Sequence, residues 1–497
     1  MGFLKSVGTS FIYIATFLAA ITYIPGLPPN IETRSYEFKL PVGINKEPNG
    51  RLNGAEKLFK GEIKGPEAFD AYDGVLYTTL HGGSVSKLVG NKLVEVVKFG
   101  KKCDGLWEEE KCGRPLGLKF DKKGNLFVAD AYYGIFKVNV KTGKYEKIVD
   151  PAQPISGRRP MLPNSIDVTS NGDLYWTDSS SDFKLYDGIF AMLADPSGRL
   201  IRYNAASKRN EVLMDKLSFA NGLKLSDDES FLLVADLGKS RIHKYHLKGP
   251  KAGKSEIFIE SLPGLPDNIH SDGQGNFLVA LPTSADEEHP QLVQSLAPHP
   301  YLRKMVLRLL GILEAPFKFL EQVYPNYYSK KIIHSIGHFE SSAFLLEKSV
   351  TVLRIDPHGH ILDVLQASDG QINTITSAFP HDGYLWLGSF SNDYLARVPL
   401  EKALPGLKKI EKKERKKVET PEVTTTPRPT TTRTTTTTTP RPTTTTQKPT
   451  TTTPKPTTTQ PPKKPVQQKK AQPDVKPVKE QPEKKNERKN EKLRDEI

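Results

Sequence analysis

GLKFDKKGNLFVAD, residues 117–130, sets two short apolar stretches on either side of a polar turn that contains Gly124. Similar runs recur at residues 166–178, 223–236, 269–280 and 381–388. Alternating apolar residues bounded by Gly, Asn and Asp turns are typical of β-strands joined in hairpins. The sequence therefore predicts that residues 65–400 consist mainly of short strands separated by turns.

The repeats begin near residues 67, 115, 164, 221, 267 and 372, at spacings of 48, 49, 57, 46 and about 105 residues. A strand-rich period of roughly 40–50 residues indicates a β-propeller, in which each period forms one four-stranded blade. Six starts predict an all-β fold, a six-bladed β-propeller over residues 31–400. The long last interval predicts an insertion at about residues 284–350.

The insertion contains YLRKMVLRLLGILEA, residues 301–315, in which apolar residues recur at helical spacing with basic residues between them. Such a helix could form a lid over the propeller axis or lie on a membrane surface. The plainer interpretation is a helix packed on the rim of the propeller.

Residues Phe11–Leu27 form an uncharged run of 17 residues, the low end of a bilayer span. Lys5 precedes this run, and Glu32 and Arg34 follow it, so the positive-inside rule places the N-terminus in the cytosol. Residues 1–30 are thus predicted to be a cytosolic stub and an N-terminal transmembrane helix acting as a signal anchor. The protein would be a single-pass type II protein of the plasma membrane or an endomembrane, with its propeller extracellular or lumenal. The alternative is a cleaved signal peptide and a secreted protein.

The C-terminal region, residues 401–497, is predicted to be a disordered tail because it lacks apolar periodicity. It holds 25 Lys/Arg against 12 Asp/Glu, which leaves +13 of the total charge of +14 there and +1 in the body. A body so near neutrality argues against nucleic acid as a partner. The Thr/Pro tract at 420–460 resembles a mucin-like stalk, with O-glycosylation expected on the Thr-rich residues 424–459.

Cys103 and Cys112 are the only cysteines in the sequence. Their short spacing fits one small disulfide loop in an oxidising compartment, in keeping with the secretory route. The alternative is a pair of free thiols in a cytosolic protein.

Four segments place Asn, Asp or Glu where a repeat begins. They are Gly65-Pro66-Glu67, Leu162-Pro163-Asn164, Phe219-Ala220-Asn221 and Leu265-Pro266-Asp267-Asn268. In a propeller these strand starts meet at one end of the central channel, and carboxylate and amide oxygens meeting there suit Ca²⁺. We therefore predict a calcium site whose metal ligands are Glu67, Asn164, Asn221, Asp267 and Asn268. Zn²⁺ is not expected because no His/Cys cluster accompanies these residues, and taken singly each residue could be an ordinary turn residue.

Several motifs resemble the strictosidine synthase-like proteins, and within them the adipocyte plasma membrane-associated protein family. These motifs are CGRPLGL at 112–118, VADAYYG at 128–134, YWTDSSS at 175–181, GLPDNI at 264–269 and HDGYLWLGSF at 381–390. The resemblance covers about residues 1–400, and the Thr-rich tail resembles that of the mucin-tailed member. It implies a six-bladed propeller on a type II membrane anchor.

Wider relatives of the family include the paraoxonases, which hydrolyse lactones and aryl esters with a central calcium. The five predicted ligands match the calcium ligands of those enzymes by motif. Ala68 and Ser165 stand where the paraoxonases have acidic ligands to a second calcium, so no second site is expected. Leu116 replaces their catalytic His. Thr376 replaces the catalytic Glu of the plant strictosidine synthases, which makes strictosidine synthase activity unexpected.

No general base can be assigned from the sequence, and His270, two residues after Asn268, is only a weak candidate. Two functions follow. One is a calcium-dependent arylesterase or lactonase acting on a small ester or lactone. The other is a non-catalytic cell-surface glycoprotein with a structural calcium, whose glycosylated stalk contacts lectins or microbial surfaces.

Overall fold

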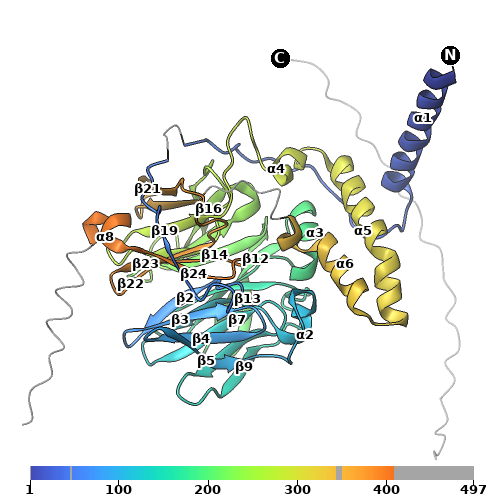
Figure 1. The fold of residues 1–497 in the computed structure, drawn as a ribbon. Coiled ribbons are helices and arrows are strands. Elements are labelled where there is room, and N and C mark those ends of the chain that lie inside the picture. Colours follow the sequence, from blue (N-terminus) through green and yellow to red (C-terminus); the bar gives the residue numbers. More distant parts are fainter. Residues whose placement is uncertain (1, 45–47, 343–349, 408–497) are drawn as a thin grey trace, which may run out of the picture. The chain divides into compact units, whose positions relative to one another are not determined.

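The computed structural model describes residues 2–44, 48–342 and 350–407 (Figure 1). The predicted stalk, its O-glycosylation sites and nearly all of the predicted tail lie outside these residues. The described part is built mainly from repeated four-stranded antiparallel sheets, six in number, and five of them use four strands in simple chain order.

The first three sheets contain β2 to β13. Their strands are β2 (Phe69–Tyr72), β3 (Val75–Leu80), β4 (Ser84–Val89), β5 (Lys92–Lys98), β6 (Pro115–Phe120), β7 (Asn125–Asp130), β8 (Gly134–Asn139), β9 (Tyr145–Val149), β10 (Pro163–Val168), β11 (Leu174–Asp178), β12 (Gly198–Asn204) and β13 (Arg209–Leu217). Hairpins join neighbouring strands, as the alternating runs predict.

The next two sheets contain β14 to β21, and the last is closed by the first strand of the chain. Their strands are β14 (Ala220–Leu225), β15 (Phe231–Asp236), β16 (Arg241–His246), β17 (Ser255–Ile259), β18 (Ile269–Ser271), β19 (Phe277–Leu281), β20 (Val350–Ile355), β21 (Ile361–Ala367), β22 (Ser377–His381), β23 (Tyr384–Gly388), β24 (Leu395–Pro399) and β1 (Glu56–Leu58). Because β1 pairs with β24, the two ends of the sheet region are fastened together.

The first strands of the sheets contact one another in the cyclic order β2, β6, β10, β14, β18, β22 and back to β2. Neighbouring sheets pack face to face through apolar residues. Phe127 and Ile135 of one sheet, for example, share a buried cluster with Ile166 and the fully buried Trp176 of the next. Repeated four-stranded sheets packed in this order are the architecture of a β-propeller.

The helices lie outside the sheets. They are α1 (Gly2–Tyr23), α2 (Glu109–Cys112), α3 (Gly188–Leu193), α4 (Leu292–Leu296), α5 (Pro300–Val323), α6 (Tyr327–Gly337), α7 (Phe339–Ser342) and α8 (Leu400–Ala403). Helices α4 to α7 form the insertion between β19 and β20, and α3, α5 and α6 lie on the same side of the sheets (Figure 1).

Helix α1 carries the segment that is apolar enough to cross a membrane, Phe3–Tyr23, with a mean hydropathy of 1.5. The uncharged run predicts a membrane helix over Phe11–Leu27, whereas α1 begins at Gly2 and ends at Tyr23. Pro25 explains the earlier end, because a proline disfavours the helical conformation of the residue before it and lacks a backbone donor. Gly26 then turns the chain at a φ of 77°.

Helix α5 runs past the helical segment predicted at 301–315 and continues to Val323. The prediction stopped before Pro316, which removes one backbone hydrogen bond from the helix interior. Packing of α5 against α6 and against α1 holds the helix through this residue.

Candidate metal and substrate site

Six residues occupy the same register position at or just before the first strands of the six sheets. In each sheet, the residue two positions further along the chain pairs with the second strand. Asn164, for example, lies two residues before Ile166, which pairs with Trp176. Asp267 likewise lies two residues before Ile269, which pairs with Val279. The six are Glu67, Leu116, Asn164, Asn221, Asp267 and Thr376. Five are polar, and the cyclic contacts between the first strands bring them to one end of the ring.

A cavity of about 640 Å³ lies at this end, and four of the five predicted ligands line it: Glu67, Asn164, Asn221 and Asp267. The fifth, Asn268, lines a second, smaller cavity, and its Nδ2 donates to Glu67 Oε1 over 3.1 Å. All five side chains are buried, with exposed fractions of 4–6%. The structure thus gathers residues from four different sheets around one buried point.

Three oxygens of this group have no hydrogen-bond partner among the described residues: Glu67 Oε2, Asn221 Oδ1 and Asp267 Oδ1. Each buried acceptor left unpaired costs about 1–3 kcal/mol. A hard cation would satisfy all of them, since Ca²⁺ prefers carboxylate and amide oxygens. The donor set therefore fits a calcium ion.

The two carboxylates are electrostatically unfavourable neighbours. Burial raises the pKa of Glu67, against the opposing effects of Arg114, Thr376 and Asn268. Burial and then the charge of Glu67 raise the pKa of Asp267 well above its ordinary value, against a hydrogen bond from Asn221. Ionising both groups is costly without a cation, and a bound dication would remove that cost.

Arg114 is the nearest positive charge to the carboxylates. Its Nη2 lies 3.9 Å from Glu67 Oε2, and its guanidinium donates to Gly65 O and Phe390 O, each over 2.8 Å. Gly65 has a φ of +57°, and a Cβ there would lie 2.6 Å from Arg114 Nη2. Position 65 therefore requires glycine. With glycine there, Arg114 can bind both the start of the first sheet and the chain just after β23 in the last sheet, and it lies beside Glu67.

Most of the remaining cavity wall is apolar, although Thr283, His289 and Gln291 also line it. Leu116, Phe219 and Leu265 lie in or just before the first strands of three sheets, and a second group of apolar residues comes from α3 and from the insertion. The second group includes Met192, Val293, Val306, Leu310 and Phe339. The cavity thus has a polar floor of oxygens and apolar walls, a form that suits an uncharged organic ligand with one polar group.

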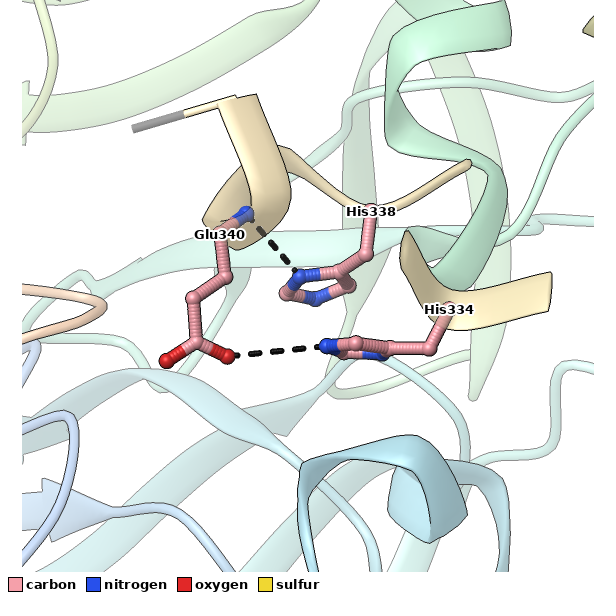
Figure 2. A group of neighbouring side chains, drawn as sticks. All are labelled: His334, His338 and Glu340. Carbon is pink, nitrogen blue, oxygen red and sulfur yellow. Dashed lines mark hydrogen bonds and ion pairs between the residues drawn. The ribbon is translucent and has the colours of Figure 1, made fainter. Parts of the chain in front are cut away.

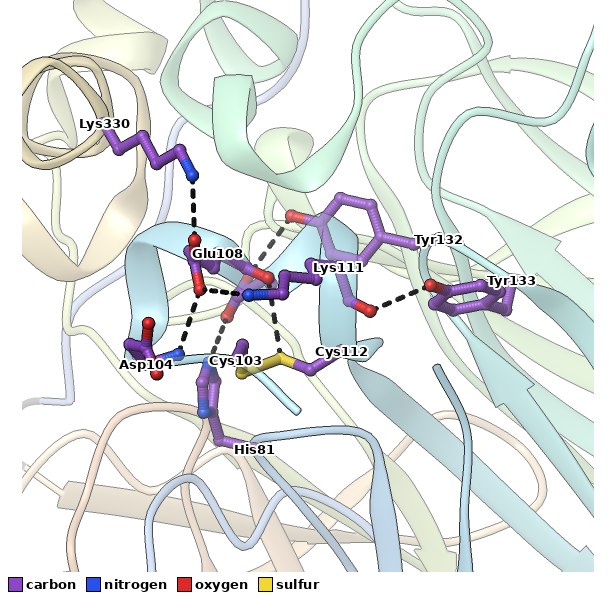
Figure 3. Close-up of a disulfide and its surroundings, with 10 residues drawn as sticks. His81, Cys103, Asp104, Glu108, Lys111, Cys112, Tyr132, Tyr133 and Lys330 are labelled. Carbon is purple, nitrogen blue, oxygen red and sulfur yellow. Dashed lines mark hydrogen bonds and ion pairs between the residues drawn. A yellow bond between two sulfur atoms is a disulfide. The ribbon is translucent and has the colours of Figure 1, made fainter. Parts of the chain in front are cut away.

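The predicted disulfide joins Cys103 and Cys112, and Figure 3 shows the loop that it closes. Glu108 in this loop pairs with Lys330 of α6 over 2.8 Å. Glu109 is buried between Tyr132 Oη at 3.0 Å and His81 Nε2 at 3.3 Å. The disulfide loop thus holds α6, and with it the insertion, against the sheets.

His334, His338 and Glu340 form a second cluster of metal-ligand residue types (Figure 2). The two imidazoles stack with their centroids 4.3 Å apart, and the candidate ligand atoms of the three residues lie within 4.8 Å of one another. His338 Nδ1 accepts from Glu340 N over 3.2 Å, and Glu340 also pairs with Lys64 over 2.8 Å. His338 Nε2 faces Glu109 Oε2 at 3.4 Å. These contacts already engage the cluster in joining the insertion to α2 and to the segment before β2.

Comparison with known proteins assigns the family. The family model for strictosidine synthase matches residues 164–250, and the model for the N-terminal region of strictosidine synthase-like proteins matches residues 47–88. The adipocyte plasma membrane-associated protein Hemomucin of Drosophila melanogaster is 43% identical over 81% of this chain and 71% of its own length. The chain belongs to the adipocyte plasma membrane-associated protein family. The Salmo salar member is 34% identical over 72% of this chain and 80% of its own length.

Among solved structures, a gluconolactonase from Xanthomonas campestris is similar to this family member over 73% of the chain and 98% of the enzyme. The TM-score is 0.45 and the sequence identity is 14%. A calcium-binding regucalcin from Agrobacterium tumefaciens gives a TM-score of 0.41 at 11% identity over 69% of this chain and 90% of its own.

The weak base candidate of this family member, His270, lines a different and smaller cavity. Its Nε2 lies 2.8 Å from Ser377 Oγ. Burial, and then the charges of Lys119 and Lys224, lower its pKa to about 3. Lys119 pairs with Asp70 over 2.9 Å, and Lys224 pairs with Asp167 over 2.7 Å. Two ammonium groups therefore line this cavity. An imidazole with so low a pKa is a weak proton acceptor.

The low pKa of His270 gives a pH-dependent prediction. The unfolded chain binds a proton at this histidine below about pH 6.5, whereas the folded chain does so only near pH 3. The contribution of His270 to the free energy of unfolding therefore falls as the pH falls, by about 2 kcal/mol between pH 7 and pH 5. We expect His270→Gln to remove that part of the pH dependence in urea unfolding measured at the two pH values. An unchanged slope would contradict the assignment.

Two further residues belong to the site although the sequence does not predict them there: Thr376 and Arg114. In the sequence, Thr376 stands out only as the residue that replaces the catalytic Glu of the plant strictosidine synthases. In the structure, its buried Oγ1 lies beside Glu67, among the polar residues at the shared register position. The strand register identifies Thr376 as a site residue. Thr376 lies two residues before Ala378, which pairs with the second strand of its sheet, as Asp267 lies two residues before Ile269. Arg114 carries no such signal, since its contacts to Gly65 and Phe390 join distant parts of the chain.

Proposed function

We propose that this family member is a membrane-anchored, calcium-dependent hydrolase that acts on apolar aryl esters or lactones. The observation that carries the proposal is the set of unpartnered buried oxygens of Glu67, Asn221 and Asp267 on the floor of a cavity with apolar walls. In this proposal each of the six sheets is one blade of a single propeller, and the site lies at one end of its axis.

Glu67, Asn164, Asn221, Asp267 and Asn268 would hold the calcium ion. When bound, Ca²⁺ would supply Lewis-acid polarisation of the substrate carbonyl and stabilise the charge that develops on its oxygen. Asn268 and Arg114 would orient Glu67 through the contacts described above. The apolar walls would bind the alkyl or aryl part of the substrate and exclude bulk water. The proposal assigns no general base.

Hydrolysis of an aryl ester by the purified full-length chain in detergent, with and without a chelator, tests this function. We expect activity that is lost on chelation, is restored by Ca²⁺ and falls at least about 100-fold in Asn221→Ala, because a missing ligand displaces the ion. Asn276→Ala is the matched control, since this amide bonds Asp272 in a turn away from the cavity. Activity that survives both chelation and Asn221→Ala would refute the proposal.

Helix α1 would anchor the protein as a single-pass type II membrane protein of the plasma membrane or an endomembrane. Lys5, in the first turns of α1 and before the uncharged run that begins at Phe11, and Glu32 and Arg34 after that run support an extracellular or lumenal propeller. The family relatives are named plasma membrane-associated proteins, in keeping with this location. Cleavage after α1 would instead release a secreted form.

A second function is favoured by the Thr/Pro tract and by the name of the Drosophila relative, Hemomucin. The stalk at 420–460 would carry O-linked glycans that bind lectins or microbial surfaces, with the calcium in a structural role. Deleting residues 420–460 is expected to abolish lectin binding and leave ester hydrolysis unchanged. Lectin binding that persists after the deletion would contradict this role.

A further inference from the structure

Helix α5 directs its charges inward. Arg303, Arg308 and Glu314 have exposed fractions of 0%, 2% and 1%. Lys318 has a side chain that is 41% exposed, and it is held toward the protein by Glu314 at 2.6 Å and Asp187 at 3.4 Å. A helix on the surface of a soluble protein has the opposite pattern, with charges outward and apolar residues inward.

The outward face of α5 is apolar. Its large exposed side chains are Tyr301, Leu302, Leu313, Phe319, Leu320 and Val323, with exposed fractions of 43–68%. Tyr324, Tyr327 and Tyr328 extend this surface to the start of α6, with exposed fractions of 47–74%. The middle of this face, residues 303–312, is buried or half-buried, and the exposed apolar surface lies towards the two ends of the helix. An exposed apolar surface of this kind marks a site of interaction with a membrane or a protein.

The end of α1 lies against this helix. Arg308 Nη1 donates to the backbone oxygens of Ile21, Thr22 and Ile24 over 2.8–2.9 Å, which satisfies carbonyls that the end of α1 leaves free. The rings of Tyr23 and Tyr301 lie 5.7 Å apart. Helix α5 is therefore fixed beside the residues at which α1 ends, with tyrosines on both helices. Tyrosine is enriched at membrane–water interfaces.

We infer that the outward face of α5, together with the start of α6, lies in the lipid leaflet at which α1 ends. The inference rests on the proposed anchoring by α1. The occupant is lipid rather than a protein, because the face carries tyrosines and aliphatic side chains, turns its charges away and adjoins the anchor. An interfacial helix buries its apolar face about 5–10 Å into the boundary between headgroups and acyl chains.

This placement bears on the substrate of the proposed hydrolase. Val306 and Leu310, on the inner side of α5, line the cavity that holds Glu67 and Asp267. The cavity wall and the lipid-facing surface are thus two faces of one helix, about 10 Å across. The substrate class expected here is an ester or lactone that partitions into the bilayer.

Fluorescence quenching by nitroxide-labelled phospholipids tests the inference on the full-length chain in liposomes. The native cysteines form a disulfide, so a fluorophore attaches only to an introduced cysteine. Leu320→Cys probes α5, Phe11→Cys probes the anchor, and Leu362→Cys, at an exposed residue of β21, is the matched control. We expect the probe at 320 to be quenched more by a nitroxide near the headgroup than by one near the chain end, and the probe at 362 by neither.

Each other outcome overturns a defined claim. Quenching at 11 without quenching at 320 refutes the inference and leaves the anchor standing. A probe at 320 that is shielded from aqueous iodide but not quenched by lipid shows that a second copy or another protein covers α5, which also refutes it. Absence of lipid quenching at 11 refutes the anchoring itself.

Discussion

Asp267→Asn is expected to abolish calcium binding and yet raise the stability of the metal-free protein. The substitution keeps the shape of the side chain but removes one of two buried charges. The buried charge of Asp267 is costly beside Glu67, as its raised pKa indicates, so its removal relieves the metal-free state. Losing a carboxylate ligand removes most of the attraction for Ca²⁺.

Thermal unfolding near neutral pH, with and without Ca²⁺, measures both effects. Wild-type protein gains about 2.7 kcal/mol at a calcium concentration one hundred times the Kd, and the variant is expected to gain nothing. Asp272→Asn serves as the control, because this carboxylate already pairs with Arg354 away from the cavity. A calcium-dependent stabilisation that survives in Asp267→Asn would contradict the site.

Asp178→Ala is expected to produce the largest loss of stability. Asp178 and Arg199 have side-chain exposed fractions of 0%, and the closest contact between them is 2.6 Å. Asp178 Oδ1 also accepts from the backbone nitrogens of Met161 and Leu162. Removing the carboxylate leaves the guanidinium buried without its partner, which costs about 3–5 kcal/mol.

Urea unfolding of Asp178→Ala measures this loss. The matched control is Asp150→Ala, whose partner Lys147 lies 3.8 Å away with both side chains more than two-fifths exposed. An exposed pair contributes at most about 1 kcal/mol. Equal losses in the two variants would contradict the structural role of the buried pair.

The sequence predicts the strands well because each hairpin is a local pattern. The run 117–130 contains both strands and the turn between them, and the structure forms β6 and β7 there. Strand β1 cannot be predicted from a local pattern. It is only three residues long, Glu56–Leu58, and its partner, β24, lies more than 300 residues further along the chain. Its pairing depends on closure of the whole ring.

Four of the five candidate ligands share a register position that the repeats reveal in the sequence, and Asn268 directly follows one of them, whereas the surroundings of these residues leave no such pattern. The unpartnered oxygens of Glu67 and Asp267 and the position of Arg114 result from contacts between distant strands. The apolar walls come from an insertion whose helical spacing was visible but whose packing was not. Apolar spacing fixes which residues share a face of α5, whereas the contacts of α5 with α6, α1 and α3 decide which face turns outward.

The most direct test of the central claim is the calcium content of the full-length protein. The protein is purified in detergent with Ca²⁺ present, passed through a desalting column and analysed for metals, with Asp267→Asn treated in parallel. Our account predicts one tightly held calcium per chain in the wild type and none in the variant. A wild-type chain that retains no calcium, or a variant that retains as much as the wild type, would contradict it.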